Sequence, residues 1–422
     1  MSEGRRNWAG NYTFRAARIH QPTTLAEVQA LVAGRRHVRA LGAGHSFNAI
    51  ADSPGDLISL ARLDRVVALD PARRTVTVEA GIRYGPLCRQ LHRAGYALPN
   101  LASLPHVTVA GACATGTHGS GDRNGVLATA VAALDLVAAD GTLVTLTRER
   151  DGERFLGAVV GLGALGVVAR LTLDLVPAFT ARQDVYEGLP LERLAAHFDA
   201  IMASGYSVSL FTDWRDGRCQ VWLKRRVDDR EDLDATPDAF GATPATRERH
   251  PIAHLPADDC TAQLGVPGPW HERLPHFRLE GMPSSGAELQ SEYLVPRRHA
   301  RAALGAVAGL RDNIAPLLQI AEVRTVAADS LWLSPCYAAD SVALHFTWAP
   351  DWSAVGALLP RLEDRLAPFA ARPHWGKLFA TPPARLRALY PKLPAFQALM
   401  RDYDPAGKFR NAFLDATIFG AP

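Results

Sequence analysis

Hydrophobic and polar positions alternate differently in the two halves of the chain. Over the first 180 residues or so, strand-like segments such as 75–81 alternate with segments of helical spacing such as 84–95. A helix is predicted from Thr24 to Gly34, because Thr24 and Glu27 have capping-box spacing and the glycine follows the last apolar turn. Residues 131–147 predict a hairpin that turns at Asp140-Gly141. This alternation is typical of α+β units.

From about residue 181 the predicted strands are separated by longer irregular connections. Strands are predicted at 206–214, 220–226, 291–295, 321–329 and 341–350, and helices after Pro296 and over 353–368. The charged, Thr/Pro-rich segment 226–250 predicts a surface loop. Beyond residue 375 the predicted segments are again short and separated by Gly and Pro. We therefore expect a first domain at 1–180, an inserted domain at 181–375, and a return to the first domain at 376–422.

Composition excludes several classes of protein. With 422 residues, 48% hydrophobic and 21% charged, the chain is long enough for two domains and is not disordered. The net charge of +3 identifies no partner, basic residues do not cluster with aromatic ones, and no apolar run reaches about 18 residues. We expect a cytoplasmic monomer that binds neither nucleic acid nor membrane. The five cysteines are scattered and give neither a disulfide framework nor a zinc site.

Two motifs match known signatures only superficially. Residues 161–166, GLGALG, satisfy the G-x-G-x-x-G pattern, but a helix-like segment precedes them and a strand-like one follows. This is the reverse of a nicotinamide dinucleotide site. Residues 271–276, HERLPH, are one residue too long for H-E-x-x-H and contain Pro275, so the histidines would not share a helix face. We expect no metal.

Two glycine-rich stretches, 41–48 and 111–121, carry stronger information. Each combines glycines with hydroxyl side chains in predicted tight turns, and such turns present backbone N–H groups to a pyrophosphate. Either stretch alone is typical of an ordinary turn. The two together, with a histidine in each, predict a cofactor that carries phosphate.

These stretches also resemble a known family. RALGAGHSFN at 39–48, TGTHG at 115–119 and DPAGKF at 404–409 resemble flavoproteins of the vanillyl-alcohol-oxidase type. Segments 98–121, 206–214, 265–277, 284–294 and 371–377 are similar to the bacterial alditol oxidases within that superfamily. The resemblance implies an α+β fold in which a two-subdomain FAD-binding domain of the PCMH/VAO type carries an inserted α+β cap domain for the substrate.

The resemblance further implies the cofactor contacts. His45 would hold FAD covalently through an 8α-histidyl bond, and Thr108 stands where the family has a serine, which preserves the hydroxyl. A small residue beside the flavin, Ala102, would admit oxygen. The other implied cofactor residues are Leu41, Gly42, Ala43, Gly44, Ser46, Phe47, Ser103, Gly111, Thr115, Gly116, Thr117, His118, Gly119, Ser120 and Val167.

Polar pairs in two otherwise apolar strands point to a substrate site. Glu322 and Arg324 are two residues apart and so share one face of a strand, as do His345 and Thr347. Charges on a buried face need partners, and the pattern alone leaves an internal ion pair as an alternative. Lys377 is one of only four lysines in the chain.

The resemblance assigns catalysis and substrate binding to these residues. The implied catalytic residues are Glu322, Arg324, His345 and Lys377, and the implied polyol-binding residues are Ser103, Glu322, Arg324, Thr347 and Lys377. The expected reaction oxidises the terminal primary alcohol of a polyol such as xylitol or sorbitol to the aldose, by hydride transfer to flavin N5, and reduces O2 to H2O2. Arg324 and Lys377 would stabilise the forming alkoxide. The alternatives are an aldonolactone oxidase or dehydrogenase of the same fold and a flavin-binding protein without turnover.

Overall fold

The first part of the chain forms a small parallel sheet. The computed structural model describes residues 5–227, 236–281 and 287–420. Helix α1 (Leu25–Gly34) connects the first two strands, and the Thr24 side chain caps it by accepting a hydrogen bond from the Glu27 N–H, as the sequence predicts. The strand order is β1 (Arg18–His20), β3 (Asp56–Ser59) and β2 (Val38–Leu41).

A five-stranded antiparallel sheet follows. The predicted hairpin is confirmed, because its two strands pair and Gly141 takes a positive φ of 87° at the turn. The sheet order is β4 (Val66–Asp70), β5 (Thr75–Glu79), β9 (Val167–Asp174), β7 (Val131–Val137) and β8 (Leu143–Thr147). The accompanying helices are α2 (Tyr84–Arg93), α3 (Val109–Ala114) and α4 (Arg148–Val159), and the short strands β6 (Tyr96–Ala97) and β10 (Val176–Pro177) pair with each other.

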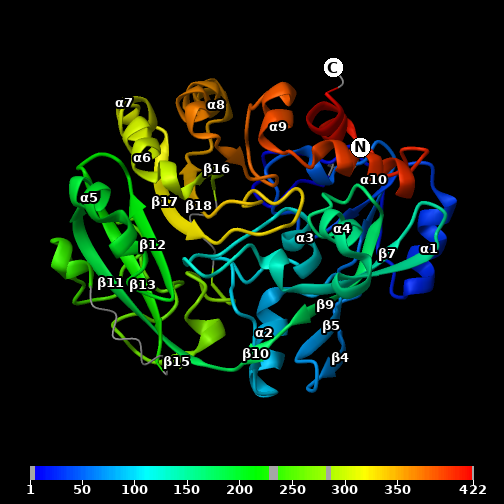
Figure 1. The fold of residues 1–422 in the computed structure, drawn as a ribbon, viewed down its shortest axis with the longest axis horizontal. Coiled ribbons are helices and arrows are strands. Elements are labelled where there is room, and N and C mark those ends of the chain that lie inside the picture. The colour runs from blue at the N-terminus through cyan, green and yellow to red at the C-terminus, as the bar shows by residue number, and fades with distance from the viewer. Residues whose placement is uncertain (1–4, 228–235, 282–286, 421–422) are drawn as a thin grey trace.

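The middle of the chain builds a nine-stranded sheet (Figure 1). Its order is β14 (Thr243–Pro244), β11 (Thr180–Pro190), β13 (Arg218–Arg226), β12 (Ser207–Thr212), β17 (Leu318–Val326), β18 (Ser341–Trp348), β16 (Leu289–Pro296) and β19 (Arg372–Pro373), with β15 (Gly268–Pro269) beside β11. One face packs against α5 (Leu191–Met202), α6 (Ala300–Ala308), α7 (Arg311–Ile314) and α8 (Trp352–Leu366). The predicted loop at 226–250 is only partly described, since 228–235 lie outside the described residues.

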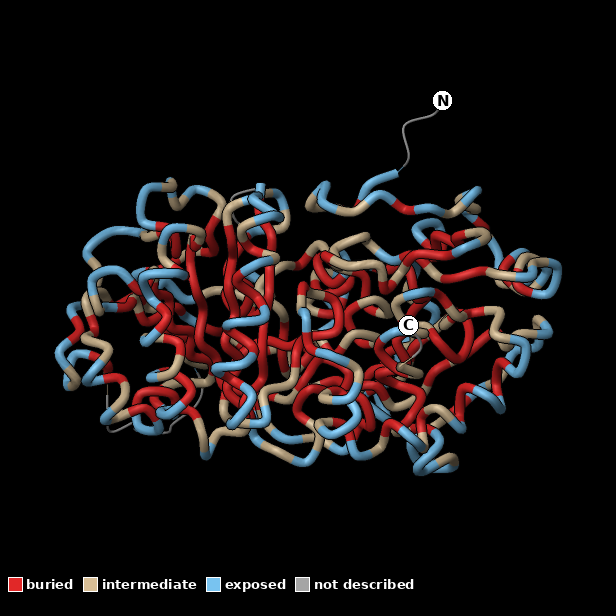
Figure 2. Tube along the Cα trace, turned by 90° about the horizontal axis from the view of Figure 1, so that it is seen from above, coloured by how far each residue is buried: buried red, intermediate tan, exposed pale blue. Residues whose placement is uncertain are grey.

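Strand periodicity gives this sheet one apolar and one polar face. In β18, Leu344, Phe346 and Trp348 belong to the core beneath the helices. His345 and Thr347 face the opposite side, where they line a cavity. Successive side chains of a strand alternate between faces, so the two polar residues share a face as predicted. The residues of the polar face line this cavity together with loops of the N-terminal half. Buried segments run through both halves of the molecule (Figure 2).

The last part of the chain packs against the first. Phe396 and Leu399 of α10 (Leu393–Tyr403) share a hydrophobic core with Phe155 of α4, and Phe409 packs with Val38 of β2. The remaining helices of this part are α9 (Pro383–Leu389) and α11 (Ala412–Leu414). Among the described residues, no helix has both the length and the apolar character needed to cross a bilayer.

Candidate active site

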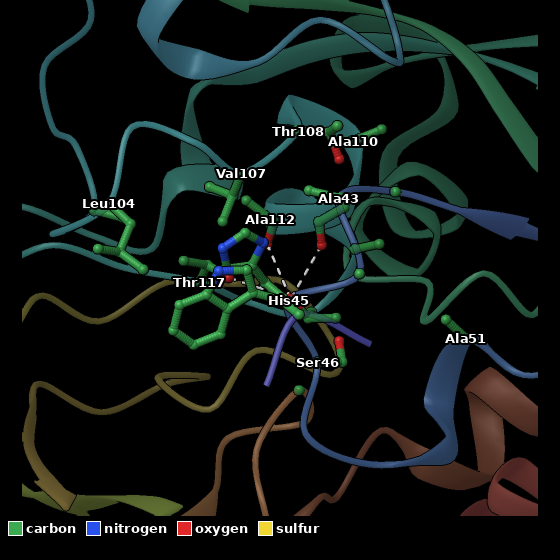
Figure 3. A pocket seen from close by; sticks show the side chains of 18 of the residues that line it. Ala43, His45, Ser46, Ala51, Leu104, Val107, Thr108, Ala110, Ala112 and Thr117 are labelled. Atoms are coloured by element: carbon green, nitrogen blue, oxygen red, sulfur yellow. Dashed lines mark hydrogen bonds between the residues drawn. The ribbon is translucent and has the colours of Figure 1, made fainter. Parts of the chain in front are cut away.

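A cavity of about 600 Å³ lies between the polar face of the nine-stranded sheet and loops of the N-terminal half. From the N-terminal half, the loop after β2, the segment around α3 and the turn at 161–166 line it. From the nine-stranded sheet, polar side chains of β16, β17 and β18 line it. Figure 3 shows Ala43, His45, Thr108, Ala112 and Thr117 gathered around this cavity. The cavity is therefore built by segments that are far apart in the sequence.

The two glycine-rich stretches meet at Thr108. A Cβ atom added at Gly42 would lie 2.7 Å from the Thr108 hydroxyl oxygen, and one added at Gly111 would lie 2.8 Å from it. Both distances are too short for a real side chain, so only glycine allows this approach. The backbones of both stretches consequently line the cavity wall.

His45 is half-buried, and both of its ring nitrogens are buried without a hydrogen-bonding partner. Its ring stacks on Trp8 with a centroid distance of 5.0 Å, and neither ring nitrogen makes a hydrogen bond within the described part of the chain. Burial, and to a lesser degree the neighbouring His106, lower the pKa of His45 to about 4. The imidazole is neutral at pH 7, and its unpaired nitrogens leave it available to a ligand in the cavity.

The turn at 161–166 contributes to the cavity wall. Helix α4 precedes it and strand β9 follows it, which confirms that it is not a nicotinamide dinucleotide motif. Nevertheless Gly161, Leu162 and Gly163 line the cavity. The guanidinium of buried Arg39 joins this turn to the loop after β2 by donating to the carbonyl oxygens of Leu162 and Ile50, each at 2.7 Å.

Most residues predicted to bind the cofactor line the cavity, and four do not. The lining residues are Leu41, Gly42, Ala43, Gly44, His45, Ser46, Phe47, Ser103, Thr108, Gly111, Thr115, Thr117 and His118, with Ala102 beside them. Gly116 lies against Pro335, Gly119 lies against the Leu101 carbonyl, and the Ser120 hydroxyl donates to the Val208 carbonyl.

The fourth exception follows from strand alternation. Val167 points into an apolar core and is fully buried there, whereas Val168 lines the cavity. The cavity at 167–168 is therefore lined by the side chain after the predicted one.

The residues of the N-terminal half that line the cavity fit a flavin dinucleotide. Glycine turns leave room for the cofactor backbone to approach, hydroxyls and backbone N–H groups suit the pyrophosphate, and the unpaired imidazole of His45 faces the same space. A group of that polarity matches the mixed polar and apolar lining of the cavity.

On the sheet side of the cavity, two carboxylates and two cations form one buried cluster. Glu322 of β17 stands opposite His345 of β18, and Glu292 of β16 stands opposite the same histidine on its other side. Glu292 accepts from the Arg324 guanidinium at 2.6 Å and from the Lys377 ammonium at 2.8 Å. The structure thus brings together the predicted residues of two strands and of the loop after β19.

Glu292 occupies the centre of this cluster and was not predicted as a site residue. It is 1% exposed, and His118 Nε2 lies 3.2 Å from it. Burial alone would raise its pKa, but Lys377, Arg324 and His118 together hold the pKa well below the usual value. A signal for it exists in the sequence, because Gln290 and Glu292 are spaced by two in a strand, as Glu322 and Arg324 are.

Lys377 and His345 form a directed pair. The Lys377 ammonium donates to His345 Nδ1 at 2.6 Å, and His345 Nε2 lies 3.1 Å from the Thr347 hydroxyl. Since Nδ1 accepts, the ring hydrogen is on Nε2 and is donated to Thr347. Burial lowers the pKa of Lys377, while neighbouring Glu292 raises it again. Each of these groups lines the cavity.

His276, from the motif set aside as a metal site, also belongs to the cluster. Its Nε2 lies 2.8 Å from Glu322 Oε1, and the ring lines the cavity. Burial would raise the pKa of Glu322, but Arg324 and His276 hold it far below its usual value. Among the described residues no group of three His, Cys, Asp or Glu side chains is placed to hold a metal ion. The histidine is thus a hydrogen-bonding partner of a carboxylate.

Apolar side chains complete the cavity beside this cluster. The wall residues are Leu104, Phe211, Ile252, Phe277 and Ile320. Ser103, between this wall and the glycine turns, receives a hydrogen bond from the Arg324 guanidinium at 3.4 Å. The site therefore combines a dense set of donors and acceptors with one apolar side.

Two protein family models and several known proteins match the sequence of this chain. A family model described as an FAD binding domain matches residues 16–147, and one described as D-arabinono-1,4-lactone oxidase matches residues 287–417. The chain is 55% identical to alditol oxidase of a Streptomyces species over the full length of both chains. It is 31% identical to L-gulono-1,4-lactone dehydrogenase of Mycobacterium tuberculosis, over 96% of this chain and 97% of that protein.

A solved structure shares the fold. The crystal structure of cholesterol oxidase from B. sterolicum superposes with a TM-score of 0.79 over 99% of this chain and 96% of that one, at 15% sequence identity. The α+β fold with an FAD-binding domain is confirmed by this likeness and by the match to the FAD domain model. From the full-length identity and the two matched domains, we conclude that the chain belongs to the alditol oxidase family of FAD-dependent flavoproteins of the vanillyl-alcohol-oxidase type.

Proposed function

We propose that this protein is an FAD-dependent alditol oxidase, which converts the terminal primary alcohol of polyols such as xylitol and sorbitol to the aldose and reduces O2 to H2O2. The observation that carries the proposal is the buried cluster of Glu292, Glu322, Arg324 and Lys377 in the wall of the cavity. A linear polyol presents many hydroxyls, and it suits a site that is dense in donors and acceptors.

A bound FAD would supply the redox chemistry, as the acceptor of the hydride from the alcohol carbon and the donor of electrons to O2. The chain's own residues would accept the proton that leaves the hydroxyl and stabilise the negative charge that develops on its oxygen. Arg324 and Lys377 supply fixed positive charge at the cavity surface, where an alkoxide would be stabilised. Because burial lowers the pKa of Lys377, its ammonium gives up and regains a proton more easily than an exposed lysine does.

The carboxylates and hydroxyls orient the substrate. Glu322 keeps a low pKa through Arg324 and His276, so it stays an acceptor for polyol hydroxyls. Ser103 and Thr347 line the same space and offer hydroxyl groups to further oxygens of the chain. The remaining catalytic residue, His345, is held by Lys377 and Thr347 in one tautomer.

The covalent tether is a second part of the proposal. His45 would carry FAD through an 8α-histidyl bond, and its neutral, unpaired imidazole supports that role. If so, flavin stays with the acid-denatured wild-type protein, and His45→Ala releases it into the supernatant. Free flavin from the denatured wild type would refute the tether and would leave FAD binding itself intact.

Oxygen access through Ala102 is supported by a second cavity. This cavity has a volume of about 350 Å³ and shares Ala102, Leu104 and Phe277 with the main one. Ala102→Val should slow oxygen-dependent turnover without slowing anaerobic reduction of the flavin. Equal loss of both rates would remove Ala102 from the oxygen path.

The deciding experiment is a substrate panel under air with peroxide detection. Xylitol and sorbitol should give H2O2 and the aldose, whereas L-gulono-1,4-lactone tests the alternative of an aldonolactone oxidase or dehydrogenase. Dye reduction without peroxide would indicate a dehydrogenase. A flavin that never bleaches under anaerobic polyol would indicate a binding protein without turnover.

The proposal also covers organisation and location. We place the FAD-binding domain at 1–180 and 376–422 and the cap domain at 181–375, because the nine-stranded sheet spans the second range. The protein would be a cytoplasmic monomer with polyol and O2 as its partners, and gel filtration of the holoenzyme tests the oligomeric state.

A further inference from the structure

Lys224 is a buried lysine just outside the cavity. It lies on β13, is 1% exposed, and does not belong to the cavity lining. Its sheet neighbours, Gln183 and Ser207, carry no charge. Burying an ammonium costs folding free energy unless each of its hydrogens has a hydrogen-bond acceptor. The acceptors around Lys224 therefore decide whether it can stay charged.

Three acceptors surround the Lys224 ammonium. Its Nζ lies 2.5 Å from the Leu274 carbonyl oxygen, 3.1 Å from that of Pro275 and 3.2 Å from His276 Nδ1. An ammonium has three hydrogens and no lone pair, so it can only donate to these atoms. His276 Nδ1 is therefore an acceptor.

The accepting Nδ1 determines the protonation of the other ring nitrogen of His276, Nε2. Burial, followed by the charge of Lys224, lowers the pKa of His276 to about 4, so the ring is neutral near pH 7. A neutral imidazole with an accepting Nδ1 carries its hydrogen on Nε2. That nitrogen lies 2.8 Å from Glu322 Oε1, with the Ser209 hydroxyl at 3.2 Å.

The ring cannot turn away from this arrangement easily. Phe211 and Trp222 contact it edge-on, each with a centroid distance of 5.3 Å. The site holds a similar pair on its other side, where Lys377 donates to His345 Nδ1. Lys377 lines the cavity, whereas Lys224 reaches it only through a histidine.

We propose that Lys224 is a positioning residue that acts through His276, fixing the Nε2–H tautomer so that the imidazole donates to Glu322 and holds this carboxylate in place for a polyol hydroxyl. The kinetic consequence rests on the proposed function. The tautomer itself does not depend on it.

The tautomer is tested on the holoenzyme with ¹⁵N-labelled histidine. Burial lowers the pKa of Lys224 to about 7, so pH 6 keeps it mainly an ammonium. The His276 signals, identified by their absence in His276→Asn, should show a protonated Nε2 and an unprotonated Nδ1. In Lys224→Met the proportion of this tautomer should fall, whereas the amide N–H of Lys224→Gln can still donate to Nδ1 and should preserve more of it. A protonated Nδ1 in the wild type, or an unchanged pattern in Lys224→Met, overturns the proposal.

A double-mutant cycle tests whether Lys224 acts through the histidine. Lys224→Met should raise KM for xylitol about tenfold, in line with the loss of one charge-assisted hydrogen bond. Lys224→Met combined with His276→Asn should be no worse than His276→Asn alone. Additive losses would mean that Lys224 acts independently of His276 and would overturn the proposal.

Lys408→Met is the matched control. Lys408 also donates to two backbone carbonyls, those of Val32 at 2.6 Å and Ala33 at 3.3 Å, and it contacts no histidine in the described structure. This variant should leave KM and the His276 signals unchanged. If the wild type oxidises neither xylitol nor sorbitol, the proposed function fails, and the NMR measurement still decides the tautomer.

Discussion

Replacing Glu292 by glutamine tests the cluster most directly. The change preserves the shape of the side chain and removes its charge, so the Arg324 and Lys377 groups, at 2.6 and 2.8 Å, lose their shared anion. Breaking a buried ion pair from one side costs about 3–5 kcal/mol. For a chain of 422 residues this lowers Tm by about 3–5 °C.

The variant should also change the pH dependence of catalysis. Glu292 raises the pKa of Lys377, which burial lowers, so Glu292→Gln lets that pKa fall further. The ammonium then loses its proton at a lower pH. The alkaline limb of kcat/KM should shift toward neutral pH, and flavin reduction at pH 8 should slow more than at pH 6.

The stability effect has its own pH signature. The pKa of Glu292 lies well below that of the unfolded chain, so its stabilisation is present above about pH 4.5 and declines as pH falls toward the folded pKa. The difference in Tm between wild type and Glu292→Gln should therefore be largest above pH 5 and shrink below it.

Thermal unfolding from pH 4 to 8 and stopped-flow flavin reduction are the assays. Glu363→Gln is the control, because Glu363 is a buried carboxylate that accepts from Tyr293, Ala380 and Thr381 and forms no ion pair within the described ranges. It should leave the kinetics unchanged. A Glu292→Gln enzyme with the wild-type Tm and an identical pH profile would refute the reasoning.

Three further predictions concern single residues. Lys377→Met should slow anaerobic flavin reduction by about 100-fold while the visible spectrum stays intact, and a rate within threefold of wild type would exclude it from catalysis. Burial raises the pKa of Asp329 to about 6. Between about pH 4 and 6 the folded state therefore binds a proton that the unfolded chain has lost, and stability falls as pH rises through that window. Asp329→Asn should flatten this trend in Tm. Thr24→Ala removes the cap of α1 and should cost about 1 kcal/mol in denaturant unfolding, and an unchanged midpoint would contradict the capping contact.

Local features followed from the sequence where short-range physics decides them. The α1 cap, the hairpin at 131–147 and the shared faces of Glu322 with Arg324 and of His345 with Thr347 depend on spacing and backbone geometry alone. Strand alternation also placed the polar pairs away from the apolar core. Family resemblance supplied the cofactor and the roles of these residues.

Only the tertiary structure decided which distant groups became partners. Glu292 is central because three strands and the loop after β19 converge on it, and nothing in its own neighbours along the chain specifies Lys377 or His118 as partners. In the sequence, His276 belongs only to a segment that does not match the H-E-x-x-H metal motif. In the fold it lies between a buried lysine and Glu322. The sequence by itself determines which face a side chain takes on its own strand, because that depends on adjacent residues. Which charges neutralise one another depends on packing across the whole chain, and packing is what sets the pKa values of this site.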